Sequence, residues 1–124
     1  MNDVVIVTGG AIRIGREICL KLSEEGYKIA IHYRSSEGDA RDLQQEIESA
    51  GGNACTIQCD LNDSDSVKEL IKNASDSLGA VVGVVNNASL FVLDRIEDVS
   101  EEAWIEHMKV NALAPLLLIQ SLLE

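Results

Sequence analysis

The chain has 124 residues and a formal net charge of −11 at pH 7. This length is sufficient for one domain with its own core, and the acidic balance argues against nucleic acid or an anionic membrane as a partner. The apolar run Leu113–Leu123 is too short to span a bilayer and contains Pro115. Because no signal-like leader precedes the first predicted strand, we expect a soluble cytoplasmic protein.

The first 25 residues predict a strand, a turn and a helix. Asp3–Val7 is a short apolar run typical of a buried strand, and Arg16–Glu25 has helical periodicity. The turn between them, Thr8–Gly15, is rich in glycine, which allows a backbone to turn tightly and to approach a pyrophosphate. This order presents a helix N-terminus to a phosphate group, although the general G-x-G-x-x-G spacing is absent. The alternative is an ordinary connection without a ligand.

The end of the second predicted strand, Lys28–Tyr33, indicates which cofactor is bound. A dinucleotide-binding fold places the residue that contacts the adenosine ribose there, and an acidic residue would favour NAD. This chain instead continues Arg34-Ser35-Ser36, which offers a guanidinium fork and hydroxyl donors to a 2′-phosphate. Arg13, from the first turn, is expected to reach the same phosphate, so the pattern predicts NADP(H). The alternative is a solvated Arg34 paired with Glu37.

Two helices and a third strand follow. Ser36–Ala50 and the residues between the N-cap candidates Asn62–Ser64 and Gly79 have apolar positions at helical spacing. Asn53–Cys59 is the strand between them. Asp60 and Leu61 stand at its carboxyl end, where open α/β sheets bind ligands. The cysteines Cys19, Cys55 and Cys59 are odd in number and at no metal-like spacing, so we expect no metal site and reduced thiols. Cys55 and Cys59 share strand parity with Ile57, so we expect these two to be buried.

The fourth predicted strand, Val81–Val85, is apolar on both faces, as in a parallel strand covered by helices on both sides. Asn86–Ser89 follows it, and Leu90–Val99 is predicted to be a loop. Ser100 is the expected N-cap of the next helix. On that helix we interpret the i, i+4 pair of Trp104 and Met108 as packing residues, and His107 as a surface residue.

Pro115 is expected to disturb the last helical segment. It lacks the N–H that would bond the carbonyl of Asn111, so a helix here would kink and free that carbonyl. The alternative is an ordinary Asn before a helix break. Leu116–Leu123 is almost entirely apolar, which predicts a helix that is covered on all sides.

Four strands alternate with five helical segments along the chain. Right-handed crossovers then give a doubly wound α/β fold with a parallel sheet of order 3-2-1-4 and helices on both faces. Residues 1–124 are expected to be a single dinucleotide-binding domain that is incomplete on its C-terminal side. The fourth strand would then be an edge strand with the sequence of a central one, so we expect the isolated chain to associate.

Four motifs resemble the short-chain dehydrogenase/reductase family: the Thr-Gly-x-x-x-Arg-x-Gly turn, Asp60-Leu61, Asn86-Asn87-Ala88-Ser89, and Asn111 before Pro115. Most of that family has Gly where this chain has Arg13 and Ser89. Both departures resemble the pteridine reductase branch.

The resemblance implies NADP(H) binding and a small-molecule substrate. It implies cofactor-binding roles for Thr8, Gly9, Arg13, Ile14, Gly15, Tyr33, Arg34, Ser35, Ser36, Asp60, Leu61, Asn87, Ala88 and Ser89. Asp60 would meet the adenine, or would simply open the loop before the next helix. The first part of the Asn86–Ser89 motif would hold the neighbouring strand. Phe91 would stack on a pterin, or would belong to the core or cover a loop. The main-chain carbonyl of Asn111 would hold a water of the proton relay, and the full-length protein would be a homo-oligomer, a tetramer in the family.

The family's chemistry needs a Tyr-x-x-x-Lys pair as its proton donor and acceptor. Tyr27 and Tyr33 are the tyrosines of this chain, and Ile31 and Glu37 stand four residues after them. We therefore expect residues 1–124 to be inactive alone. Three functions follow: the N-terminal portion of an NADPH-dependent reductase acting on a C=N or C=O bond, a non-catalytic NADP-binding module, or a structural interaction fragment.

Overall fold

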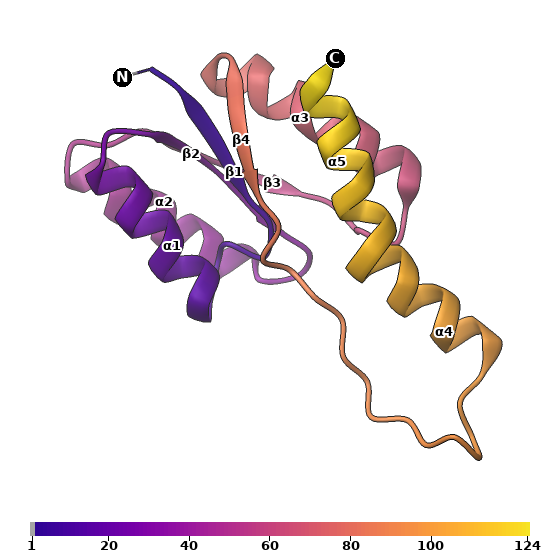
Figure 1. Ribbon diagram of the computed structural model, residues 1–124. Helices are drawn as coiled ribbons and strands as arrows, with labels where there is room; N and C mark the ends of the chain where they lie inside the picture. The colour runs from indigo at the N-terminus through magenta and orange to yellow at the C-terminus, as the bar shows by residue number, and fades with distance from the viewer. Residues whose placement is uncertain (1) are drawn as a thin grey trace.

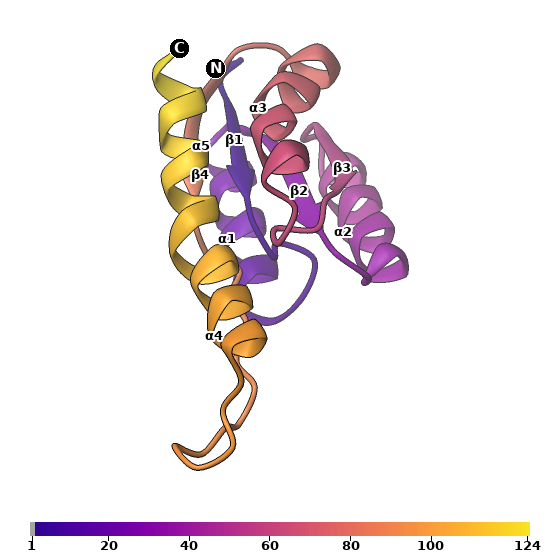
Figure 2. The ribbon, with the colours of Figure 1, turned by 90° about the vertical axis from the view of Figure 1, so that its right-hand side faces the viewer.

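A four-stranded parallel sheet lies between two layers of helices in the computed structural model, which describes residues 2–124 (Figures 1 and 2). The strands are β1 (Val4–Val7), β2 (Lys28–Tyr33), β3 (Ala54–Gln58) and β4 (Val81–Val85). The helices are α1 (Arg13–Glu24), α2 (Glu37–Ser49), α3 (Ser64–Leu78), α4 (Glu101–Met108), the π-helical turn η1 (Lys109–Leu113) and α5 (Ala114–Leu123). The strand order is β3-β2-β1-β4 with every pair parallel, so the predicted topology is confirmed.

The two faces of the sheet bury separate cores. Helices α1 and α2 cover one face, where Val5 and Val7 of β1 pack with Leu43 and Ile47 of α2. Helices α3 and α5 cover the other, where Val4 and Ile6 pack with residues such as Leu118 of α5. Alternate residues of β1 therefore serve opposite layers, which is why its sequence is continuously apolar.

The predicted element boundaries agree with the structure to within a few residues. The largest shift is at α1, which begins at Arg13 instead of Arg16. Ser100 caps α4 as predicted, because its Oγ accepts from the Ala103 N–H at 3.1 Å. The disturbance expected near Pro115 takes the form of the π-helical turn η1, in which the Ala114 N–H donates to the Lys109 carbonyl.

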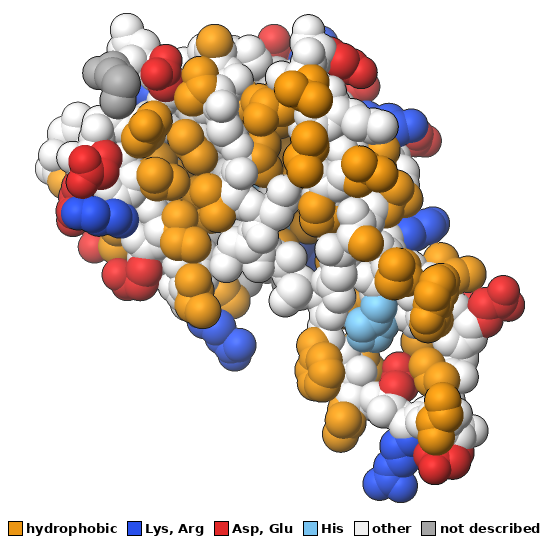
Figure 3. Space-filling model, viewed as in Figure 1, with side chains coloured by type: hydrophobic (Ala, Val, Ile, Leu, Met, Phe, Trp, Pro, Cys, Tyr) orange, Lys and Arg blue, Asp and Glu red, His pale blue; other side chains and the backbone are white. Residues whose placement is uncertain are grey.

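After β4 the chain extends away from the sheet and from the helices that cover it (Figure 1). Residues 91–100 are all exposed and form a protruding segment that returns at α4 (Figure 1). The interpretation of Trp104 and Met108 as packing residues is wrong, because Trp104 is 60% exposed and Met108 is exposed too. Their spacing shows that they share a helix face, but not that anything covers it. Figure 3 shows hydrophobic side chains gathered near β4 and on this segment.

Candidate functional site

A cavity of about 380 Å³ opens at the carboxyl end of the sheet, where the turn after β1 meets the ends of β2, β3 and β4. It is lined by Gly9, Ala11, Ile12, Arg13, Ile14, His32, Tyr33, Arg34, Ser35, Ser36, Asp60, Leu61, Asn87, Ala88, Ser89, Leu90 and Val110. Twelve of the predicted site residues are in this set. Segments that are distant in sequence are therefore brought together at one site, as expected for the ends of parallel strands.

The glycine turn forms a tightly packed wall of this cavity. Gly9 has a φ of +61°, a conformation that favours glycine. Gly15 is buried under the turn, where a Cβ atom would collide with the Gly9 carbonyl and lie 2.7 Å from Nδ2 of Asn87. Gly15 therefore does not line the cavity, but only glycine lets α1 start this close to the turn.

The N-terminus of α1 opens on the cavity without a cap of its own. Ile12 is the N-cap residue, its side chain accepts no hydrogen bond, and no acidic residue stands in the first turn. Arg13 follows with a φ of +53°, in the left-handed region that non-glycine residues seldom adopt. Ile14 is 71% exposed beside it. The first amides of α1 are thus positioned to bind an anion, with a guanidinium adjacent.

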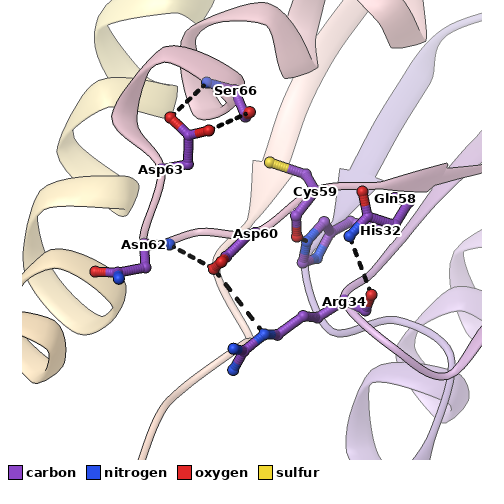
Figure 4. Close-up of polar contacts among 8 residues, drawn as sticks. All are labelled: His32, Arg34, Gln58, Cys59, Asp60, Asn62, Asp63 and Ser66. Carbon is purple, nitrogen blue, oxygen red and sulfur yellow. Dashed lines mark hydrogen bonds and ion pairs between the residues drawn. The ribbon is translucent and has the colours of Figure 1, made fainter.

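The opposite wall carries the second arginine. Nε of Arg34 lies 4.0 Å from Oδ1 of Asp60 (Figure 4), and the Arg34 side chain is largely exposed whereas that of Asp60 is about half-exposed. Glu37 instead pairs with Arg41 at 2.7 Å, so the pairing of Arg34 with Glu37 is wrong, whereas the Arg34 side chain is solvent-exposed, as that alternative expected. Oδ1 of Asp60 also accepts from the Asn62 N–H at 3.0 Å, so this carboxylate opens the loop before α3 while it faces the cavity.

Thr8 and Asn87 join the glycine turn to the end of β4. Thr8 is 1% exposed, and its Oγ1 accepts from the Asn87 and Ala88 N–H groups at 3.0 Å. Nδ2 of Asn87 donates to the carbonyls of Thr8 and Gly9. Thr8 therefore lies behind the cavity wall. The strand-holding role that we expected of the first part of the Asn86–Ser89 motif is performed by Asn87.

Phe91 and Asn111 lie outside the cavity. Phe91 is 81% exposed on the protruding segment, so it belongs to neither the core nor the cavity wall. The Asn111 side chain forms two hydrogen bonds with the Leu90 backbone, accepting from its N–H at 2.7 Å and donating to its carbonyl at 2.8 Å. Nε2 of His107 accepts from the Val92 N–H at 3.1 Å. The backbone is thus held on both sides of Phe91.

Some cavity residues were not predicted as site residues. Ala11, Ile12, Leu90 and Val110 are apolar and carry no sequence signal for a ligand. His32 is 2% exposed in β2, although a histidine within an apolar strand is a signal that could have been followed.

Two further findings concern the described residues, 2–124. None of the helices among them is long and apolar enough to cross a membrane. No group of three or more His, Cys, Asp or Glu side chains in this part of the chain could hold a metal ion.

Comparison with known proteins adds independent findings. Residues 3–124 match the family model described as short chain dehydrogenase. The 3-oxoacyl-(acyl-carrier-protein) reductase FabG of Staphylococcus epidermidis is 35% identical over 111 residues, which cover 90% of this chain and 46% of that protein. The chain thus spans about half the length of the curated relatives it matches.

Solved structures are similar over nearly the whole chain. FolM alternative dihydrofolate reductase 1 of Brucella canis, complexed with NADP, is 38% identical with a TM-score of 0.92, covering 98% of this chain and 48% of that one. A blue fluorescent protein from a metagenomic library, in complex with NADPH, is 34% identical with a TM-score of 0.92, covering 98% and 50%.

Proposed function

The chain belongs to the short-chain dehydrogenase family, and on this premise we propose that it is the cofactor-binding portion of an NADPH-dependent oxidoreductase. The observation that carries the proposal is the cavity at the carboxyl end of the sheet, with an uncapped helix N-terminus and an arginine on each of two walls. Similar proteins are described as complexes with NADP or NADPH, which supports the same cofactor here.

The residues around the cavity fit a phosphorylated dinucleotide. Gly15 packs closely under the turn, and the amides at the uncapped N-terminus of α1 would bind a pyrophosphate. Arg13 and Arg34 both line the cavity, which supports a role for these two cations in binding a 2′-phosphate, and Ser35 and Ser36 would add hydroxyl donors. Asp60 lies on the wall expected to meet the adenine. NADPH, when bound, supplies a hydride, and these residues would hold and orient the cofactor.

We further propose that the reduced bond belongs to a pteridine. Arg13 and Ser89 line the cavity, and FolM of Brucella canis is similar over almost the whole chain. Phe91, next to the clamped Leu90, would stack on the flat ring. The similarity to a 3-oxoacyl reductase favours a second candidate, the 3-oxo carbonyl of a 3-oxoacyl thioester.

The proton chemistry would come from outside residues 1–124. This stretch contains no Tyr-x-x-x-Lys pair, so we expect it to bind cofactor without turnover. Asn111 would contribute its main-chain carbonyl to the relay. In an α-helix the Asn111 carbonyl would accept from the N–H of residue 115, which is a proline and has none. The π-helical turn η1 at this place also supports the proposal, because such turns frequently occur at functional sites.

Titration of the native gene product with NADPH and NADH tests the cofactor, and NADPH oxidation with a dihydropteridine or a 3-oxoacyl thioester tests the substrate. We expect tighter binding of NADPH and turnover of the dihydropteridine. Turnover by residues 1–124 alone would contradict the proposal that the proton-transferring residues lie outside this stretch. Failure to bind either dinucleotide would overturn the proposed function.

We also propose that the protein works in the cytoplasm as a homo-oligomer. Val82 of the edge strand β4 and several apolar residues of α4 and α5 are exposed, which favours association. Sedimentation of residues 1–124 is expected to show oligomers or aggregates, and a well-behaved monomer would contradict this.

A further inference from the structure

His32 connects two walls of the cavity through its imidazole ring. Nδ1 accepts from the Gly9 N–H at 2.9 Å, and Nε2 lies 2.8 Å from the Cys59 carbonyl (Figure 4 shows the ring beside Cys59). Because Nδ1 is an acceptor, Nε2 must carry the proton and donate to Cys59. Gly9 belongs to the glycine turn, and Cys59 directly precedes Asp60, so one side chain links the two walls.

The main chain of the same residue completes the link. The His32 carbonyl accepts from the Gly10 N–H at 3.0 Å. His32 therefore binds the amides of both Gly9 and Gly10, and those amides are not available to a ligand. The left-handed conformation of Gly9, with a φ of +61°, is fixed by a partner from the adjacent strand.

We propose that His32 is a positioning residue for the cofactor. It holds the glycine turn against β2, so that the following amides at the α1 N-terminus face the pyrophosphate, and its bond to Cys59 keeps the ring in the tautomer that accepts from Gly9. This inference rests on the proposed NADP(H) function. His32 touches the scaffold of the site, and we assign it no contact with the reacting atoms.

The ionisation of the ring agrees with this role. Burial lowers the pKa of His32 below its usual value of 6.5. The neutral ring is the form with an acceptor nitrogen for Gly9, and it is the form present at neutral pH.

Two amide substitutions separate the two hydrogen bonds. In His32→Asn the amide oxygen takes the place of Nδ1, so the bond to Gly9 is retained. In His32→Gln the amide nitrogen takes the place of Nε2, so the bond to Cys59 is retained and the Gly9 N–H loses its acceptor. A turn without that acceptor populates conformations that do not bind cofactor, and apparent affinity falls with the competent fraction.

The experiment measures the Kd for NADPH of the native gene product and of both variants, with thermal unfolding alongside. We expect His32→Asn to stay within about threefold of the wild type and His32→Gln to bind about tenfold more weakly, as for a buried donor left unpaired. Equal Kd values in the two variants would overturn the inference and leave the proposed function intact. A wild-type protein that binds no NADPH would defeat the proposed function itself.

A measurement on the wild type keeps the inference testable if a variant fails to fold. Long-range ¹H–¹⁵N spectra report the tautomer, and hydrogen exchange reports the protection of the Gly9 amide. We expect protonated Nε2 and a protected Gly9 amide. Protonated Nδ1 or rapid exchange at Gly9 would overturn the inference.

Discussion

Helices α1 and α3 both begin at the carboxyl edge of the sheet, but their N-termini are completed in opposite ways. At α3 the Asp63 side chain accepts from the Asp65 and Ser66 amides, and a further acidic residue stands in the first turn. At α1 the N-cap residue is Ile12, no side chain caps the helix, and Arg13 follows. The N-terminus of α3 is therefore capped by its own Asp63 side chain, whereas the N-terminus of α1 leaves its amides facing the cavity.

This difference separates structural positions from ligand-binding ones. Every helix N-terminus has amides without an intrahelical partner, and a short polar side chain usually satisfies them. An apolar N-cap and a strained arginine at α1 forgo that stabilisation. The arrangement becomes favourable when an anion supplies the missing acceptors, as a pyrophosphate would.

The largest effect on stability and cofactor binding is expected from Gly15→Ala, which disrupts the packing between the α1 N-terminus and the glycine turn. The new Cβ would lie against the Gly9 carbonyl and 2.7 Å from Nδ2 of Asn87, so backbone must move. We expect a loss of about 3 kcal/mol in the free energy of unfolding and loss of measurable NADPH binding. Denaturant unfolding and fluorescence titration check both.

Gly38→Ala is the matched control, because Gly38 also lies in the first turn of a helix but has open space around it. It should stabilise the protein by about 0.5 kcal/mol. If Gly15→Ala were tolerated equally well, the close approach of α1 to the glycine turn would not matter for the site.

The second prediction gives α1 the kind of cap that α3 has. In Ile12→Asp a carboxylate would accept from the first α1 amides and repel the cofactor phosphates. NADPH binding should weaken about thirtyfold, while stability stays the same or increases. Isothermal titration and thermal unfolding measure the two effects. Ile12→Asn, a neutral cap, should weaken binding less, and an unchanged NADPH affinity in Ile12→Asp would mean that these amides do not bind the phosphates.

The third prediction removes a cation instead of adding an anion. Arg34→Ala should weaken NADPH binding about thirtyfold and leave NADH binding nearly unchanged, because the 2′-phosphate alone would lose its charged partner. Arg41→Ala is the control, since Arg41 pairs with Glu37 on the exposed side of α2. Equal losses for both cofactors would contradict the assignment of Arg34 to the 2′-phosphate.

Sequence patterns predicted the sheet order because it depends on local periodicity and crossover handedness. Most of the cavity wall was predicted from the meeting of strand ends together with the resemblance to the short-chain dehydrogenase/reductase family. They failed where the outcome depends on distant partners. Thr8 was predicted to bind cofactor, yet its hydroxyl binds the backbone of the segment after β4. The spacing of Trp104 and Met108 fixed a shared face but not its cover. His32 was missed because neither of the groups its ring binds is adjacent in sequence.

The smallest effect is expected at the α3 cap. Hydrogen bonds from Ser66 lower the pKa of Asp63 below its usual value of 3.8. A carboxyl with a lowered pKa stabilises the fold above its unfolded pKa, and this contribution is lost as the pH falls through the folded value. Asp63→Ala should therefore lower Tm by about 4 °C at pH 7, with a smaller difference below pH 3.8.

NADPH affinity should not change in Asp63→Ala, which is the opposite of the outcome expected for Ile12→Asp. Asp63→Asn keeps a neutral cap, so its Tm should stay near the wild type and its stability should lose the pH dependence that this carboxylate contributes. The two helix ends are then distinguished by which property responds: stability at α3, cofactor affinity at α1. If Asp63→Ala weakened NADPH binding as much as Ile12→Asp did, the α3 N-terminus would also belong to the binding site, and the contrast between the two helix ends would no longer hold.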